Sequence, residues 1–186
     1  AKYLLGNDQL GRDTLSRLIQ GARISILIGL TVTTIDVVIS TLIGGISGFL
    51  GGKFDLLVQR WCDAWTTFPG LLLLLTIMSI VGPGIPQIIL VLGISGGIGG
   101  SRVIRGAVIA IKENDYFLAA EATGNRRVRT LIRHVVPNIM PVIIIVFSIS
   151  LGGHILSLAS LSFLGFGLPP GSPDWGSLLS IEGRQY

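Results

Sequence analysis

The stretch FLAAEATGNRRVRTLIRHVVPN, residues 117–138, separates two long apolar parts of the chain. It carries four arginines and one histidine between Arg126 and His134. Lys and Arg close to an apolar span resist translocation and are retained on the cytoplasmic side of a membrane. This contrast in polarity predicts a cytoplasmic loop between two membrane-spanning helices.

The composition of the whole chain is typical of an integral membrane protein. Of its 186 residues, 49% are hydrophobic and 13% are charged, whereas soluble domains have about 25% charged residues. The mean hydropathy is +0.74. Cys62 is the single cysteine, which excludes an internal disulfide, and no Cys/His spacing typical of structural zinc is present. The sequence also carries no catalytic constellation that would indicate an enzyme.

The positive charge of the chain is concentrated in one segment. Residues 102–134 hold seven Lys or Arg and three Asp or Glu, which accounts for the whole formal net charge of +4. This distribution follows the positive-inside rule for a cytoplasmic loop. We expect no nucleic-acid partner, because basic grooves for nucleic acid usually carry exposed aromatic side chains or a known reading module.

Four apolar segments are candidates for crossing a hydrocarbon core of ~30 Å, which takes about 20 helical residues. With the basic loop inside, both ends of the chain lie outside. We expect a single transmembrane domain, 1–186, with an extracytoplasmic amphipathic lead-in at 1–23, spans at 24–50, 56–80, 87–100 and 135–164, a cytoplasmic loop at 101–134, and an extracytoplasmic segment at 165–186.

Glycines recur at four-residue spacing within the predicted spans. Small residues at this spacing let helix backbones approach closely in lipid, where apolar surfaces gain little from association. We therefore expect these glycines to mark helix-packing faces: Gly44, Gly48 and Gly52 in the first row, and the pairs Gly93 with Gly97 and Gly96 with Gly100 in the second.

Two sets of ionisable residues lie in or near the predicted spans. Asp36 lies within the first span, where a charged side chain is costly and by default indicates a function. It is either a water-facing residue of a transport pathway or the partner of a cation on a neighbouring helix, and the sequence leaves both open. Arg60 and Asp63, three residues apart on one helix face, are expected to form a local ion pair.

The residues of the basic loop favour two short helices around a tight turn. Ala119 and Ala120 are small and form helix readily, and Gly124 is a natural helix stop. Pro137 then falls in the first turn of the next span, where its missing N–H costs little. Such an element could dock into a groove on another protein, or it could simply be a positive-inside loop; the physical pattern alone leaves both open.

This loop resembles the Glu-Ala-Ala coupling loop of the permeases of binding-protein-dependent ABC transporters, through Ala119, Ala120, Gly124 and Pro137. Other stretches are similar to the dipeptide, oligopeptide and nickel branch of that family. Together they cover nearly the whole chain: LGNDQLGRDTLSRLIQGARIS, FPGLLLLL, GPGIPQIIL, RHVVPN, LSFLGFGLPPGSPDWG and EGRQY.

The resemblance implies an all-α integral membrane protein of a prokaryotic cell (inner) membrane, with the MetI-like transmembrane bundle of a type I ABC importer permease and about four of its six spans. It implies a second permease subunit in a heterodimer, two cytoplasmic ATPase subunits and an extracytoplasmic solute-binding protein, with membrane lipid around the spans. ATP and Mg would be bound by the ATPases, so this chain would hold no cofactor. The cargo would be a dipeptide, an oligopeptide or a nickel complex.

The resemblance also suggests which residues form the sites, and the sequence departs from the family pattern at several positions, among them His134 and Val136, which replace the Ile and Leu of the general motif. The segment GFGLPPGSPDWG is a candidate for meeting the binding protein. Leu118 and Leu158 stand where the family has Glu, and Asp36 occupies a position that is normally uncharged. The ATPase-docking residues would be Ala119, Ala120, Glu121 and Gly124, with Arg126, Arg127 and Arg129 as charge contacts.

Two rival functions come from other classes of membrane protein. In a secondary transporter or channel subunit, Asp36 would carry a coupling ion and the basic loop would only set the topology. A structural membrane subunit would have no solute path at all. Dependence of transport on ATP rather than on an ion gradient discriminates the first rival from the ABC permease.

Overall fold

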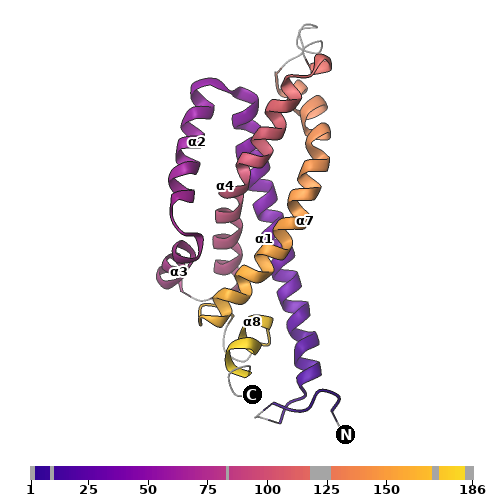
Figure 1. The fold of residues 1–186 in the computed structure, drawn as a ribbon, viewed down its shortest axis with the longest axis vertical. Helices are drawn as coiled ribbons and strands as arrows, with labels where there is room; N and C mark the ends of the chain where they lie inside the picture. The colour runs from indigo at the N-terminus through magenta and orange to yellow at the C-terminus, as the bar shows by residue number, and fades with distance from the viewer. Residues whose placement is uncertain (1–2, 9–10, 83, 118–126, 169–171, 183–186) are drawn as a thin grey trace. The chain divides into compact units, whose positions relative to one another are not determined.

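The computed structural model describes residues 3–8, 11–82, 84–117, 127–168 and 172–182. These residues are almost entirely helical, and the strand-like pairing within them is an isolated bridge between Asn7 and Asp13. The helices are α1 (Thr14–Leu50), α2 (Gly52–Thr67), α3 (Gly70–Val81), α4 (Ile85–Lys112), α6 (Arg127–Thr130), the π-helix η1 (Leu131–Val135), α7 (Val136–Phe163), α8 (Trp175–Ser177) and the π-helix η2 (Leu178–Glu182) (Figure 1).

Three helical segments are long and apolar enough to cross a membrane: Thr14–Leu50, Ile85–Lys112 and Leu131–Phe163. A fourth span is possible if α2 and α3 are counted together, although they are bent by 85° where they meet. The expected all-α, multi-pass membrane protein is confirmed.

The helix bounds differ from the expected spans mainly at the start of the first segment and at the end of the third. Helix α1 begins at Thr14, so the second half of the expected lead-in 1–23 is continuous with the apolar stretch that follows. Helix α4 continues past Gly100 to Lys112. Both extensions follow from the cooperativity of helices, because adding a residue to an existing helix costs far less than starting a new one.

Proline explains the break between α2 and α3. Helix α2 ends at Thr67, and Phe68 has an extended backbone with φ −76° and ψ 138°. The residue before a proline avoids the α conformation, because the proline ring clashes with it. Pro69 therefore turns the expected span 56–80 into two helices that meet at a sharp angle.

Pro137 lies in the first turn of α7, as expected. However, α7 follows α6 and η1 without a break, so the proline lies within a continuous helical segment and does not open a new one. A proline ring inside a helix clashes with the carbonyl four residues earlier. The turn before it is π-helical, and the N–H of Val136 donates to the carbonyl of Leu131. The wider π-turn, which is typical of insertions into α-helices, accommodates the ring.

The chain divides into two compact units, of which the first comprises Ala1–Thr33, Gly70–Leu92 and Leu151–Tyr186. Its core is apolar and includes Leu158, whose side chain is 1% exposed. A Glu carboxylate at this position would be buried among hydrocarbon, which is costly, and Leu158 fits these neighbours. The core residues are Ile28, Val32, Leu74, Met78, Ile88, Leu92, Leu158 and Leu161.

The second unit comprises Thr34–Pro69 and Gly93–Ser150. Its helices include α2 and the second half of α4, which lie side by side (Figure 1). The core brings together the end of α1, the end of α4 and the start of α7. Its residues are Phe49, Ile104, Val108, Ile111, Phe117, Val135 and Ile139.

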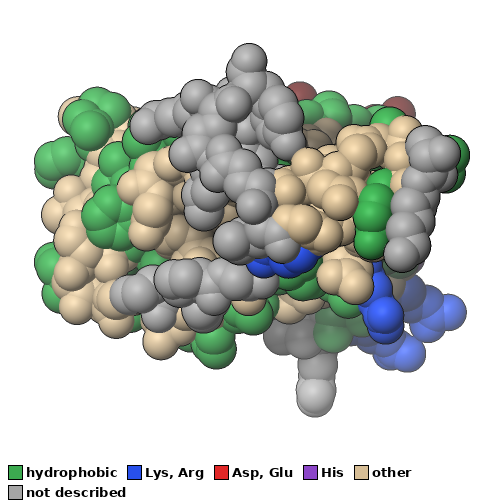
Figure 2. Space-filling model, turned by 90° about the horizontal axis from the view of Figure 1, so that it is seen from below, with side chains coloured by type: hydrophobic (Ala, Val, Ile, Leu, Met, Phe, Trp, Pro, Cys, Tyr) green, Lys and Arg blue, Asp and Glu red, His purple; other side chains and the backbone are tan. Residues whose placement is uncertain are grey.

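Large apolar side chains are also exposed on the outside of the helices, for example Leu57 on α2, Leu72 on α3 and Ile149 on α7. Figure 2 shows green apolar side chains at several places on the described part of one face. In water a surface of this kind would favour aggregation. In a bilayer it contacts lipid tails, which are equally apolar.

Candidate functional site

Within the second unit, α1 and α4 approach each other closely at glycines of both helices. A Cβ added at Gly44 would overlap the carbonyl oxygen of Ser101 and lie 2.9 Å from the backbone nitrogen of Arg105. A Cβ at Gly97 would lie 2.6 Å from the Cβ of Ile39. The expected packing role is therefore confirmed for Gly44 and Gly97. Gly52 instead has a φ of 60° and an open surrounding, so it serves the turn into α2.

Asp36 lies on the face of α1 that meets α4. Its side chain is 3% exposed, and a Cβ added at Gly100 would lie 3.5 Å from its Oδ1. The carbonyl oxygen of Asp36 would be 3.0 Å from a Cβ at Gly97. The structure thus places Asp36 against small residues in the interior of this unit. Its two expected roles, in a pathway or beside a cation, remain predictions.

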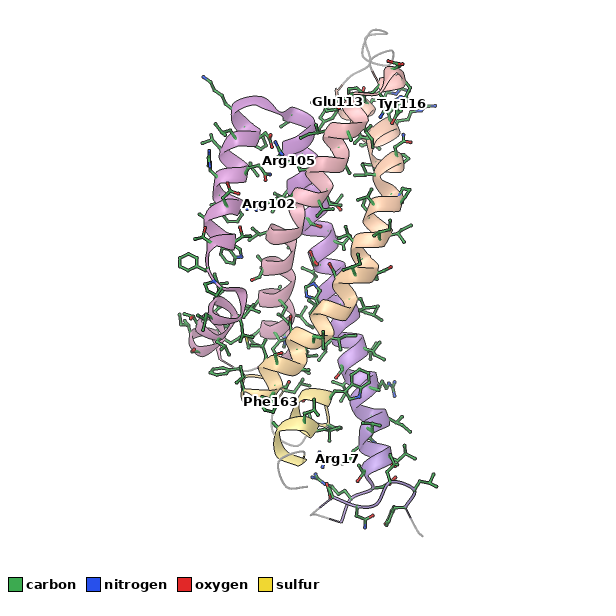
Figure 3. All side chains as sticks on the ribbon, viewed as in Figure 1. Arg17, Arg102, Arg105, Glu113, Tyr116 and Phe163 are labelled. Carbon is green, nitrogen blue, oxygen red and sulfur yellow. The ribbon has the colours of Figure 1, made fainter. Side chains whose placement is uncertain are left out.

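A row of polar contacts, which we call the polar seam, joins α2 to α4. Arg105 donates from Nε to Oδ1 of Asp55 at 2.6 Å and from Nη2 to Oδ2 at 2.5 Å. One turn away, Nη2 of Arg102 donates to Oδ1 of Asp63 at 2.5 Å. Both arginines lie between α4 and α2 in Figure 3. Paired Arg–carboxylate contacts of this geometry are strong and directional.

The expected pair Arg60–Asp63 is present, but its Nη1–Oδ2 distance is 3.7 Å and the Arg60 side chain is 74% exposed. The shorter contact of Asp63 is with Arg102, which the sequence analysis missed. A signal was available, because Arg102 and Arg105 are three residues apart and share a helix face. Their partners on α2 could not be chosen without knowing the register between the two helices.

The two ends of the expected docking segment lie in the core of the second unit. Phe117, the last described residue before it, is 1% exposed. Its ring meets that of Phe49 edge to face, with centroids 6.3 Å apart and planes at 83°. Beyond the segment, Val135 and Ile139 are buried in the same core.

Lys112 joins this group from the end of α4. Its Nζ donates to the carbonyl oxygen of Phe49 at 2.8 Å and to that of Gly48 at 3.5 Å. It also lies 5.8 Å from the centroid of the Phe49 ring, within the range of cation–π attraction. We call the group Phe49, Lys112, Phe117, Val135 and Ile139 the anchor cluster.

The docking residues themselves are only partly described. Of Arg127 the backbone is described, at the start of α6, and Arg129 is exposed on the same short helix. Whether Arg129 contacts a partner remains a prediction. The positions that lie outside the described residues are Leu118, Ala119, Ala120, Glu121, Gly124 and Arg126.

A compact turn precedes α1 in the first unit. The buried carboxylate of Asp8 accepts hydrogen bonds from the backbone N of Arg12 at 2.7 Å, from its Nε at 2.6 Å and from Nη1 of Arg17 at 2.7 Å. Burial raises the pKa of Asp8, but the hydrogen bonds from Arg12 and Arg17 outweigh it and lower the pKa from 3.8 to about 2. The turn is therefore held by an ionised carboxylate.

We expect Asp8 to stay ionised well below the pH at which an ordinary Asp is protonated. Because its pKa is lower in the folded chain, ionised Asp8 stabilises the turn fully above about pH 4. That contribution is lost as the pH falls through about 2. Carbon NMR titration of the Asp carboxyls of the full-length subunit in micelles would measure this. Arg17→Gln should raise the pKa of Asp8, and an unshifted Asp8 in the unchanged protein would contradict the expectation.

The segment after α7 is fastened to α1 in the first unit. Asp174 caps α8, accepting from the backbone N of Gly176 at 2.9 Å and of Ser177 at 3.1 Å. The backbone N of Trp175 donates to Oγ of Ser25, and its indole Nε1 donates to the carbonyl of Leu18, both at 3.4 Å. These contacts hold the end of GFGLPPGSPDWG, at Asp174 and Trp175, against α1.

Metal ligands do not gather in the described part of the chain, where no group of three His, Cys, Asp or Glu side chains is close enough to hold an ion.

Residues 40–182 match the protein family described as the binding-protein-dependent transport system inner membrane component. The chain belongs to this family. The sequence-based assignment to ABC transporter permeases of the dipeptide and oligopeptide kind is thereby confirmed, as is the inner membrane location. The family is a transport component and not a family of enzymes.

Three relatives illustrate the match. The oligopeptide transport system permease protein OppC of Bacillus subtilis is 37% identical over 178 residues, covering 96% of this chain and 58% of the relative. The di/tripeptide transport system permease protein DppC of Pseudomonas aeruginosa is 38% identical over 186 residues, 100% of this chain and 61% of the relative. The glutathione transport system permease protein GsiD of Pectobacterium atrosepticum is 35% identical over 178 residues, which cover 96% of this chain and 59% of the relative. The chain thus spans about three fifths of the length of these permeases.

Proposed function

We propose that this chain is the membrane-spanning part of a permease subunit that forms half of the translocation pathway of an ABC importer for peptides. The observation that carries the proposal is the family match over residues 40–182. Relatives that cover nearly all of the chain are named for oligopeptides, for di- and tripeptides and for glutathione, which is itself a small peptide. A peptide cargo follows from these names, and a nickel complex becomes the second candidate.

In such an importer, partner subunits would hydrolyse the ATP. Two cytoplasmic ATPases would dock on the segment that contains Ala119, Ala120, Glu121 and Gly124, with Arg126, Arg127 and Arg129 as charge contacts. A second permease subunit would complete the pathway, and an extracytoplasmic binding protein would deliver the peptide. Closure of the ATPases would rock the helix bundles and switch the cavity from outward to inward facing.

The proposal is tested by uptake into proteoliposomes that contain the full-length subunit with its genetic neighbours. Labelled dipeptide, oligopeptide, glutathione and nickel chelate are supplied in turn, with ATP or with an ion gradient. We expect ATP-dependent uptake of at least one peptide.

The variant Gly124→Pro should abolish both uptake and co-purification of the ATPases, because proline cannot follow most turn conformations that glycine permits. Gly99→Ala is the control, since a Cβ at Gly99 meets nothing within 4 Å. Uptake that is driven by an ion gradient and unaffected by Gly124→Pro would instead favour a secondary transporter, with Asp36 as its ion-binding residue. ATP-driven uptake of the nickel chelate alone would replace the peptide cargo.

A further inference from the structure

The anchor cluster lies where the expected docking segment joins the spans. Phe117 immediately precedes this segment, and its ring is buried against Phe49 at the end of α1. Buried aromatic rings in a close-packed core shift together with their neighbours, because interiors have little free volume. A displacement of the docking segment would therefore be passed to Phe49, the residue of α1 in this core.

Lys112, the last residue of α4, makes polar contacts with the end of α1. The carbonyls of Gly48 and Phe49 are among the last four of α1, which lack partners within the helix. The Nζ of Lys112 donates to both, and a cation at this end is favoured by the helix dipole. The last residue of α4 thus caps the end of α1.

The residues that follow the docking segment, Val135 and Ile139, belong to the same cluster. Thr130 on α6 is buried, as are Val135 at the end of η1 and Ile139 on α7. The turn between them is π-helical, a form often found at functional sites. Both ends of the docking segment are therefore held by one group of side chains from α1, α4 and α7.

We propose that the anchor cluster links the docked ATPases to the spans, with Lys112, Phe49 and Phe117 as positioning residues for coupling. The inference rests on the proposed function. Docking itself uses the segment after Phe117, whereas the anchor cluster passes the movement of that segment to α1 and α7. Weakening the contacts within the anchor cluster should therefore uncouple ATP hydrolysis from transport without preventing the ATPases from binding.

The test compares Lys112→Met with Lys112→Arg in the full complex in proteoliposomes. Met keeps an unbranched stem but loses the ammonium, and Arg keeps the positive charge. For Lys112→Met we expect ATPase co-purification and hydrolysis close to wild type, with peptides taken up per ATP reduced by about fivefold, the lower end of typical coupling between sites. Lys112→Arg should restore most of the ratio. Lys53→Met, at an exposed lysine near the start of α2, is the matched control and should leave the ratio unchanged.

Other outcomes separate the two proposals. An unchanged ratio in Lys112→Met, or a parallel fall of assembly, hydrolysis and uptake, would overturn the coupling role. Phe117→Leu gives a second variant at the same site, and we expect it to lower the ratio in the same direction. Uptake by the unchanged protein that does not need ATP would defeat the proposed function itself, whatever the variants do.

Discussion

Gly44→Ala is expected to destabilise the folded subunit by about 1–3 kcal/mol, the usual cost of overpacking a close contact. The added methyl group would meet the carbonyl oxygen of Ser101 and the backbone nitrogen of Arg105. Because both are backbone atoms, no side-chain rotation can relieve the overlap, and α4 must move away from α1. Unfolding of the full-length subunit in mixed micelles, followed by tryptophan fluorescence, measures the loss.

The neighbouring glycine provides the control. A Cβ at Gly45 meets nothing within 4 Å, and alanine forms helix better than glycine by roughly 1 kcal/mol in water. Gly45→Ala should therefore be neutral or stabilising. Equal effects of the two substitutions would show that α1 and α4 do not meet at Gly44, and the close contact in the second unit would have to be abandoned.

The glycine contact could be predicted from the sequence because its signal is local. Small residues four apart lie on one helix face whatever the rest of the chain does. The same reasoning located the apolar helices, since about 20 apolar residues suffice for a span. It failed at helix ends: α1 starts at Thr14 and α4 reaches Lys112, because helices extend through polar residues once they have formed.

Contacts between distant residues could not be predicted, because they depend on how two helices are aligned. Asp55 and Arg105 are 50 residues apart, and the sequence offers several other carboxylates to Arg105. Leu158 is a different case. Its departure from the family's Glu was visible in the sequence, but the apolar neighbours that suit a leucine there were found only in the folded unit. The docking residues remain a prediction of the family pattern.

Arg105→Ala is expected to destabilise the subunit by roughly 2–3 kcal/mol, somewhat less than the 3–5 kcal/mol typical of a fully buried ion pair that loses one partner. The side chain of Asp55 is 11% exposed and that of Arg105 is 32% exposed, so water can compensate only part of the loss. The variant removes two charge-assisted hydrogen bonds and leaves a carboxylate facing α4. The same micelle unfolding assay measures the effect.

Arg60→Ala is the matched control on α2, since that arginine is largely exposed and its contact with Asp63 is long. Exposed pairs of this kind contribute about 0–1 kcal/mol, so we expect a change of less than about 0.5 kcal/mol. If both arginine variants lost the same stability, the effect would reflect removal of positive charge from the subunit and not the specific pair in the polar seam.

A double replacement separates the cost of breaking the pair from its net contribution. Asp55→Leu alone leaves the guanidinium of Arg105 without its carboxylate and should destabilise. Asp55→Leu combined with Arg105→Met should recover most of the loss, because replacing a buried ion pair by apolar side chains of similar size is often neutral or stabilising. The expected coupling energy between the two sites is about 1–3 kcal/mol. Additive losses would mean that the two side chains act separately, and α2 would then be held to α4 by its other contacts, at Arg102 and Ser101.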